Sequence, residues 1–317
     1  MDELICMCCL NRIFGFKPDL SRALVRTLGS ASAVFTLTGD QLFELLPGSY
    51  KIRKEICGET LEKTSIELEH LARQGIHFLP FTDPAFPPLL KETPNGPIGL
   101  YVRGQLPDIG RNCIAVVGTR SISNYGSEWC RRIVDTLASI PEKPAIISGL
   151  ALGTDIRAHE AAVRDGLPSI GVLPCGIDTV YPHQHHDFAE ALCRLPESGL
   201  VTDYPPATAP LPIHFLRRNR IIAGMASATI VIESGIRGGS MITARDAFEF
   251  NREVYALPGR VDDPHSQGCN YLIRNDMAEA IESMESLKES LAAALKFRRK
   301  ADPEPLLFDP DAPDLYD

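Results

Sequence analysis

Short apolar runs alternate with amphipathic stretches through the middle of the chain. Runs such as CIAVVG from Cys113 and ATIVIES from Ala228 are rich in valine and isoleucine and have the length of buried strands. Between such runs Trp129, Ile133 and Leu137 recur at intervals of four, the spacing of one helix face. Strands that are apolar throughout and separated by helices are typical of a parallel sheet covered on both sides. The pattern predicts an α/β fold, a Rossmann-like parallel sheet with helices on both faces.

The same pattern divides the chain into four stretches. Residues 1–75 carry leucines at helical spacing and predict a small helical domain. Residues 76–111 are rich in proline and predict a connecting segment with short strands. Residues 112–283 hold the alternation and predict the Rossmann-like core. In residues 284–317 we expect the end of a C-terminal helix and then a disordered acidic tail.

The helix expected after the second run has signals at both ends. Thr154 is a candidate N-cap because its hydroxyl can accept from the first free amides. Gly166 is a candidate C′ residue, where a left-handed conformation ends a helix. We therefore expect a helix between these two residues.

Composition and charge narrow the class of protein. Of 317 residues 44% are hydrophobic and 23% charged, which is ordinary for a soluble domain. No apolar run approaches the roughly 20 residues of a membrane helix, and no basic-flanked signal peptide opens the chain. We expect a cytoplasmic protein without a membrane partner. The net charge of −9 argues against a generally basic nucleic-acid binder but leaves room for a local basic patch.

Two clusters of metal-ligating residue types are better explained without a metal. Cys6, Cys8 and Cys9 lack the paired spacing of a zinc site and are expected to be core or surface thiols. The histidines of YPHQHHDF, which begins at Tyr181, fall in a turn without supporting carboxylate spacing and predict a solvated loop. We expect no metal and no cofactor.

Three glycine-rich turns follow predicted strands: GTRS at 118–121, SGLALGTD at 148–155 and ESGIRGGSMITA at 233–244. The carboxyl ends of parallel strands lie at one edge, where helix N-termini present free amides. Small residues there let a phosphate approach the main chain closely. The first turn lacks the glycines of a dinucleotide fingerprint, and no Gly-Lys-Ser/Thr of a Walker A loop occurs. The turns predict a phosphate-binding ledge rather than an NAD or ATP site.

Arginines approach the same edge. Arg120 lies in the first turn, and Arg217, Arg218 and Arg220 precede the strand at 228–234. Guanidinium groups bind phosphates and stack on bases, and Phe215 could offer a stacking face. In the alternative interpretation Phe215 fills core, and an arginine pairs with Glu233 or Asp203.

In chain order, AVVGTRSISNYG, ISGLALGTDIRAHEAAV, IGVLPCGIDTVYP, FLRRNRIIAG, GGSMITARDA and YALPGRVDDPHSQGCNYLI resemble the DNA-processing protein A family (DprA, also called Smf). The resemblance covers about residues 75–281. It implies a single-stranded DNA-binding protein of natural transformation that protects incoming DNA, dimerises and helps load the RecA recombinase. It also implies that the N-terminal helices are SAM-like.

The resemblance assigns DNA-binding roles to residues of all three turns and of the arginine helix. These are Gly118, Thr119, Arg120, Ser148, Gly149, Gly153, Phe215, Arg218, Asn219, Arg220, Gly239, Ser240 and Thr243, to which the charge pattern adds Arg217. The chain departs from the family at Thr154, where an apolar residue is usual. We also expect that this sequence lacks the C-terminal winged-helix domain that many members carry.

Two other functions remain open from the residues. Gly238, Gly239, Thr243 and Asp246 resemble the constellation of nucleotide phosphoribohydrolases related to lysine-decarboxylase-like proteins. Asp246 is better explained as an acid near a helix N-terminus, because no second positioned acid or base is evident. We therefore expect no enzyme activity and no catalytic residue. A partner scaffold that does not bind DNA is the third interpretation.

Overall fold

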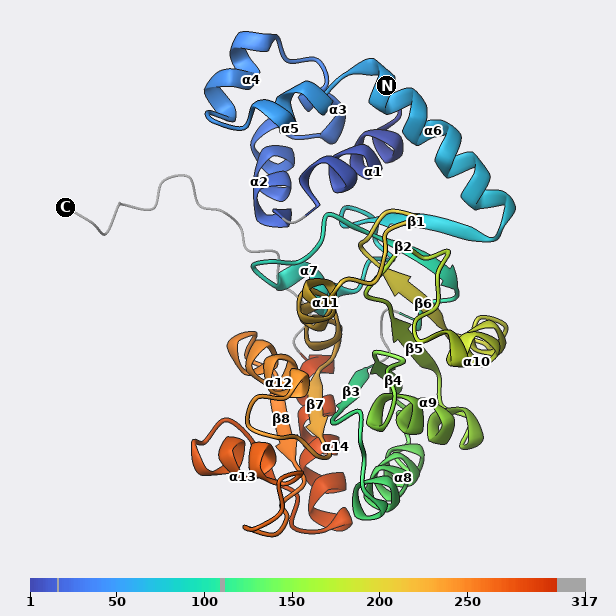
Figure 1. Cartoon of the computed structure of the whole chain (residues 1–317), viewed down its shortest axis with the longest axis vertical. Coiled ribbons are helices and arrows are strands. Elements are labelled where there is room, and N and C mark those ends of the chain that lie inside the picture. The colour runs from blue at the N-terminus through green and yellow to red at the C-terminus, as the bar shows by residue number, and fades with distance from the viewer. Residues whose placement is uncertain (16, 109–111, 301–317) are drawn as a thin grey trace, which may run out of the picture.

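A mixed sheet of nine strands forms the centre of the computed structural model, which describes residues 1–15, 17–108 and 112–300. The strand order is β1-β2-β6-β5-β4-β3-β7-β8-β9 (Figure 1). The strands are β1 Ile76–Pro80, β2 Gly99–Gly104, β3 Cys113–Val117, β4 Ala145–Ser148, β5 Ser169–Val172, β6 Gly199–Thr202, β7 Ala228–Val231, β8 Glu253–Ala256 and β9 Glu279–Ala280.

Helices precede, connect and follow these strands. They are α1 Glu3–Phe14, α2 Pro18–Leu28, α3 Ala31–Val34, α4 Gly39–Leu45, α5 Tyr50–Glu55, α6 Gly58–Arg73, α7 Pro88–Glu92, α8 Asn124–Ala138, α9 Thr154–Arg164, η1 His183–His185, α10 His186–Leu192, α11 Pro212–Met225, α12 Gly239–Glu249, α13 Gln267–Arg274 and α14 Met284–Lys300. Among the helices that the structure describes, none has the length and apolar character to cross a membrane.

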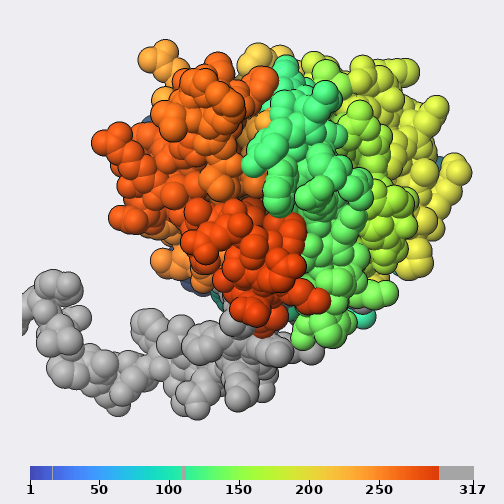
Figure 2. Space-filling view, turned by 90° about the horizontal axis from the view of Figure 1, so that it is seen from below, coloured from blue at the N-terminus to red at the C-terminus, as the bar shows by residue number. Residues whose placement is uncertain are grey.

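The sheet buries both of its faces, as the apolar runs predict. Along β3, Ile114 and Val116 pack on one side against α8, α9 and α14. Ala115 and Val117 alternate to the other side and join the core beneath α11 and α12. Figure 2 shows α8, in green, beside the start of α14, in red, on the first of these faces. The Rossmann-like α/β prediction is confirmed.

The sheet differs from the prediction at one edge, where it is antiparallel. The stretch at 76–111, expected to be a connection with short strands, adds β1 and β2 to the sheet. Six of the eight strand pairings are parallel, whereas β1 pairs antiparallel with β2 and β2 pairs antiparallel with β6. These two strands come before the first crossover helix of the core, so no βαβ connection forces them to be parallel. The predicted connection is therefore an integral edge of the sheet.

The N-terminal helices α1–α6 lie over this antiparallel edge (Figure 1). One core runs from α1 into β2, and the Cys8 Sγ lies 3.2 Å from the Tyr101 hydroxyl. Cys6, Cys8 and Cys9 are all buried free thiols. Burial raises the pKa of Cys8 to about 12, so its unreactive thiol packs as an apolar group. Residues 301–317, where we expect a disordered acidic tail, lie outside the described residues.

The expected N-cap of α9 is wrong, whereas the expected C′ glycine is found. Gly153, not Thr154, occupies the N-cap, and Thr154 is the first residue of the helix. The Thr154 hydroxyl is used elsewhere, because it donates to the Thr119 carbonyl 3.2 Å away. At the other end Gly166 follows the C-cap with φ of 68°, as a C′ glycine should.

Replacing Ile147, which is fully buried in the central strand β4, with alanine should leave a cavity in the core. We expect Ile147→Ala to lower the free energy of unfolding by about 2–5 kcal/mol. Urea denaturation measures this loss. Ile66→Ala, which removes the same atoms from a side chain 62% exposed on α6, should change stability by less than about 0.5 kcal/mol. Equal losses in the two variants would contradict the placement of β4.

Candidate nucleic-acid interface

The order of the strands creates a crevice at the carboxyl end of β3. From β3 the chain adds β4, β5 and β6 on one side, and then returns to add β7 and β8 on the other. The loops that leave β3 and β7 therefore diverge, which is the topological switch point where ligands bind in open α/β sheets. A cavity of about 490 Å³ lies there, between these loops and the helices α11 and α12.

The loop after β3 is bonded to its neighbours on both sides. The Thr119 amide donates to the Glu233 carbonyl at 2.7 Å, and the Thr119 carbonyl accepts from the Thr154 amide at 3.1 Å. The amide and hydroxyl of Ser123 both donate to the buried Glu233 carboxylate, at 2.9 and 2.5 Å. These bonds hold the loop at 118–123 in one position relative to β7 and α9.

Gly153 makes the close contact between α9 and this loop possible. Its φ is +77°, and a Cβ at this position would lie 2.3 Å from the Thr119 carbonyl oxygen. Both the backbone angle and the contact exclude larger residues. Gly153 therefore positions the pocket loop from behind and does not itself line the cavity.

Arg218 forms part of the inner wall of the cavity. Its side chain is buried, its Nη1 donates to the Val172 carbonyl at 2.5 Å, and its guanidinium lies against the Cα of Gly149. A Cβ on Gly149 would come within 2.0 Å of that Nη1, so only glycine leaves room for the guanidinium. Burial lowers the pKa of Arg218, and the nearby negative charge of Asp155 opposes this.

Asp155 is the carboxylate that lines this cavity. It accepts hydrogen bonds from the amides of Gly149, at 3.1 Å, and Ala151, at 3.4 Å. Burial raises the pKa of Asp155, and the positive charge of Arg218 lowers it. The carboxylate thus folds the loop after β4 and partly balances the charge of Arg218.

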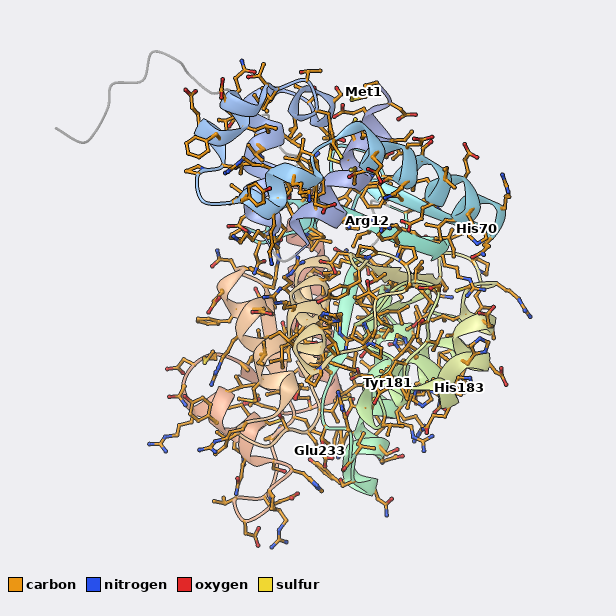
Figure 3. The ribbon with its side chains drawn as sticks, turned by 45° about the horizontal axis from the view of Figure 1, so that its top comes forward. Met1, Arg12, His70, Tyr181, His183 and Glu233 are labelled. Carbon is orange, nitrogen blue, oxygen red and sulfur yellow. The ribbon has the colours of Figure 1, made fainter. Side chains whose placement is uncertain are left out.

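Three side chains stack at the mouth of the cavity. The Arg120 guanidinium carbon lies 5.0 Å from the centre of the Phe215 ring. The Tyr181 ring meets Phe215 edge-on, with centroids 5.4 Å apart and an interplanar angle of 76°. Arg120 is exposed and Tyr181 is 41% exposed, so a ligand can reach this group. Figure 3 labels Tyr181 in the sheet region, well away from Met1 in the N-terminal helices.

The N-terminus of α12 forms the opposite wall. The cap residue Gly238 supplies no side-chain hydrogen bond, and Ser240 donates its hydroxyl proton to Ser234 at 2.8 Å. The Asn219 side-chain amide donates to the Gly239 carbonyl at 3.1 Å and ties α11 to this turn. First-turn amides and the helix dipole make such a wall suitable for an anion.

The structure brings nine of the fourteen predicted site residues together around this cavity, which we call the switch-point pocket. They are Gly118, Thr119, Arg120, Phe215, Arg218, Asn219, Gly239, Ser240 and Thr243. Ser148, Gly149 and Gly153 lie behind its wall, where the Ser148 hydroxyl donates to the Val116 carbonyl at 2.6 Å. Arg217 and Arg220 are outside the lining.

The expectation that Arg220 faces the pocket is wrong. Arg220 forms an ion pair with Asp203 and donates to the Asn95 carbonyl at 2.7 Å, and its side chain is only 11% exposed. Successive residues of a helix turn by about 100°, so positions 217, 218 and 220 cannot share one face. Phe215, Arg218 and Asn219 do share the pocket face. The alternative pairing with Asp203 therefore describes Arg220.

Among the lining residues that the sequence analysis did not assign to the site, Asp155 carries a charge and Tyr181 an aromatic ring. In the sequence Asp155 looks like an ordinary acidic residue in the first turn of a helix. Its place in the SGLALGTD turn, which was predicted to contact phosphate, could have indicated that it lies at the pocket. Tyr181 opens the histidine-rich segment. Within that segment the His185 Nδ1 lies 2.7 Å from the Leu150 carbonyl, and the His183 and His186 rings stack with centroids 5.8 Å apart.

In the described part of the chain, one group of side chains has the spacing of metal ligands. Ligand atoms of Glu233, Asp263 and His265 lie within 4.8 Å of one another. Ser123 already donates to both carboxylate oxygens of Glu233, and Asp263 accepts from the His265 amide and the Ser266 hydroxyl. Hydrogen bonds within the protein are therefore sufficient to hold these three side chains close together.

The constellation of the enzyme interpretation is incomplete in the pocket. Gly238, Gly239 and Thr243 line the cavity, whereas Asp246 does not. Burial and the negative charge of Glu249 raise the pKa of Asp246 to about 6, against the opposing charge of Arg220. Asp246 therefore lies apart from the groups that face the cavity.

Comparison with known proteins identifies the relatives of this chain. Residues 77–292 match the model of the family described as DNA recombination-mediator protein A. The Smf protein of Escherichia coli is 39% identical over 246 residues, which cover 77% of this chain and 64% of that protein. The DNA processing protein DprA of Streptococcus pneumoniae is 35% identical over 66% of this chain and 73% of its own length. The resemblance to the DprA/Smf family is confirmed.

Solved structures agree with this family. The crystal structure of DprA from Streptococcus pneumoniae matches with a TM-score of 0.74 at 27% identity, over 88% of this chain and 94% of the other. DNA processing protein A from Helicobacter pylori, solved for its single-stranded DNA binding mode, matches with a TM-score of 0.58 at 27% identity, over 69% and 96% of the two chains.

The Gly153→Ala variant tests the contact that positions the loop. The methyl group would meet the Thr119 carbonyl, and the residue would keep an unfavourable positive φ. We expect the free energy of unfolding to fall by about 2 kcal/mol or more in chemical denaturation. Gly39→Ala, at the start of α4 with nothing within 4 Å, should leave stability unchanged or raise it by up to about 1 kcal/mol. A neutral Gly153→Ala would disprove the close contact.

The pKa of Asp246 predicts a pH dependence of stability. Its pKa is higher in the folded chain, about 6, than its ordinary value of 3.8, so the folded chain binds the proton more tightly. Stability therefore falls as pH rises from about 4 to about 6. The Asp246→Asn variant should lose this decrease of stability with pH. Its free energy of unfolding at pH 7 should be higher by about 1–2 kcal/mol, after allowance for partial solvent screening. Urea denaturation from pH 4 to 7 measures both, with the exposed Glu44→Gln as the unaffected control.

Proposed function

The chain belongs to the DNA recombination-mediator protein A family, and we propose that it binds single-stranded DNA in the switch-point pocket without carrying out chemistry on it. The observation that supports this most is the Arg120–Phe215–Tyr181 stack beside the uncapped N-terminus of α12. A guanidinium and helix amides suit phosphates, and aromatic faces suit bases. The two kinds of group lie at one opening, as a single strand requires.

This arrangement favours a single strand over a duplex. The bases of a single strand can unstack and lie on Phe215 while the neighbouring phosphates reach Arg120 and the α12 amides. In a duplex the bases are paired and stacked inside the helix, so Phe215 cannot reach their faces. Every base has an aromatic face, so stacking on Phe215 is open to strands of any sequence. The pocket would hold DNA with little sequence preference.

The family and its relatives support a role in DNA recombination. The matched family is described as a recombination mediator, and the relatives include proteins named DNA processing protein DprA. We infer that this chain acts in the cytoplasm as a homodimer, protects incoming single-stranded DNA during natural transformation and helps load the RecA recombinase. The match spans 64% of the Escherichia coli relative, less than two thirds of its length, so the activities of that whole protein enter here only as part of the proposal.

The phosphoribohydrolase interpretation is less well supported. It needs a carboxylate inside the pocket that is free to act on a ligand. Asp246 lies outside the lining of the pocket. The Asp155 carboxylate, next to the buried Arg218, already accepts hydrogen bonds from two backbone amides. Binding without chemistry agrees better with these positions.

Two substitutions at the pocket mouth should weaken DNA binding in different ways. Arg120→Ala removes a charge, so the slope of log affinity against log salt should flatten by about 0.7. Phe215→Ala removes a stacking face, so affinity should fall by about 1–3 kcal/mol with the slope unchanged. Gel shifts across a salt series, with single- and double-stranded DNA of equal length, measure both effects.

The matched control for these variants is Arg73→Ala. Arg73 is an exposed arginine on α6, away from the pocket, so its removal should leave affinity and slope as they are. A preference for duplex, or the same loss in Arg73→Ala as in Arg120→Ala, would refute the proposed function.

A further inference from the structure

Exposed large apolar side chains line the pocket or lie next to its lining residues in the chain. Tyr181 and Leu216 line the pocket, and four more exposed side chains are sequence neighbours of lining residues: Leu152, Leu211, Ile213 and Ile236. These six are among the sixteen large hydrophobic side chains that are exposed in the described part of the chain. Such a concentration indicates a binding surface. With Arg120 and the α12 amides beside it, the surface suits a ligand that carries both anionic and apolar groups.

The chain itself contains a segment with this composition. Residues 301–317, ADPEPLLFDPDAPDLYD, contain six acidic residues and no lysine or arginine, with Phe308 and Tyr316 set among the acids. Carboxylates can take the place of phosphates, and aromatic rings can take the place of bases. In both respects the segment resembles a short single strand of DNA.

The segment is long enough to reach the pocket. It follows α14, which packs on the sheet face opposite α11 and α12. Seventeen extended residues span at most about 60 Å. A domain of this size has a radius of gyration of about 20 Å, so such a segment can pass around the edge of the sheet to the pocket mouth.

We propose that residues 301–317 occupy the mouth of the switch-point pocket when DNA is absent and compete with single-stranded DNA for it. Arg120 and the first-turn amides of α12 offer positive charge to the carboxylates of this segment, and Phe215 offers a face to an aromatic ring such as that of Phe308 or Tyr316. This inference rests on the proposed function, since the same groups bind the DNA. DNA then binds only after the segment has left.

A weak contact is enough for a measurable effect. A tethered segment has an effective concentration of about 1 mM. A contact with a Kd of about 0.1 mM would then lower the apparent affinity for DNA about tenfold. The free segment therefore needs only modest affinity for the pocket.

The first experiment compares the full chain with three variants by fluorescence anisotropy of a labelled oligothymidylate of about 20 nucleotides. We expect removal of residues 301–317 to raise affinity about tenfold, and Asp309→Asn/Asp311→Asn/Asp314→Asn to give most of that gain in a chain of full length. The control Asp40→Asn/Glu44→Gln/Glu55→Gln removes as many acids from exposed positions in the N-terminal helices. It should leave the affinity unchanged.

Three results of this comparison would overturn the inference. They are unchanged affinity after removal of the segment, an equal gain in the control, and a gain that accompanies a change of mass in light scattering. An equal gain would show general repulsion between an acidic chain and DNA. A change of mass would assign the mouth to a second copy of the chain. In all three cases the DNA still binds, and the proposed function stands.

The second experiment does not depend on DNA. A fluorescent peptide of residues 301–317 is titrated with the chain that ends at Lys300. We expect saturable binding that Arg120→Ala and Phe215→Ala both weaken and that Arg73→Ala leaves intact. No binding at millimolar protein, or equal binding by all variants, overturns the inference. If neither the full nor the shortened chain binds oligothymidylate, the proposed function fails, and this titration alone still decides whether the segment binds the pocket.

Discussion

The backbone of Thr119 holds together the loops on which the switch-point pocket depends. Its amide donates to the carbonyl of Glu233 after β7, and its carbonyl accepts from the first amide of α9. One residue therefore joins the loop after β3 to both neighbouring segments. Gly153 supplies the close approach that these bonds require, and the Glu233 carboxylate fixes the far end of the loop through Ser123. The position of the loop after β3 is thus set by contacts behind the pocket, in which the backbone takes a large part.

The parallel part of the fold was predictable because its signal is local. Central strands such as β3 and β4 are buried on both faces, so each appears in the sequence as an uninterrupted apolar run. The alternation of these runs with helices then indicates a parallel sheet covered on both sides. The antiparallel edge was not predictable in this way. The pairing of β2 with β6 joins Tyr101 to Thr202, about 100 residues apart, and a proline-rich stretch carries no local sign of that register.

The pocket was predictable as a location but not in its details. Glycine after a strand marks the loops, because only glycine tolerates contacts such as that between Gly149 and the Arg218 guanidinium. Three arginines on one helix indicate local charge, but the direction of each depends on the orientation of α11. That orientation turns Arg218 into the pocket and Arg220 toward Asp203 and the Asn95 carbonyl. The partners of Arg220 come from distant segments, so only the assembled fold could separate the two residues.

The distribution of charge explains how a chain with a net charge of −9 can still offer a local site for an anion. At the inner wall of the pocket Asp155 lies near Arg218 and partly offsets its charge. The positive potential then comes from the exposed Arg120 and from the amide dipoles of α12, which act over short distances. Such a site holds an anion that is already at the mouth but attracts little from afar. In the proposed function, occupancy therefore depends on contacts with the Phe215 and Tyr181 rings as much as on charge, and the rings expected to distinguish a single strand from a duplex would also supply a large share of the binding energy.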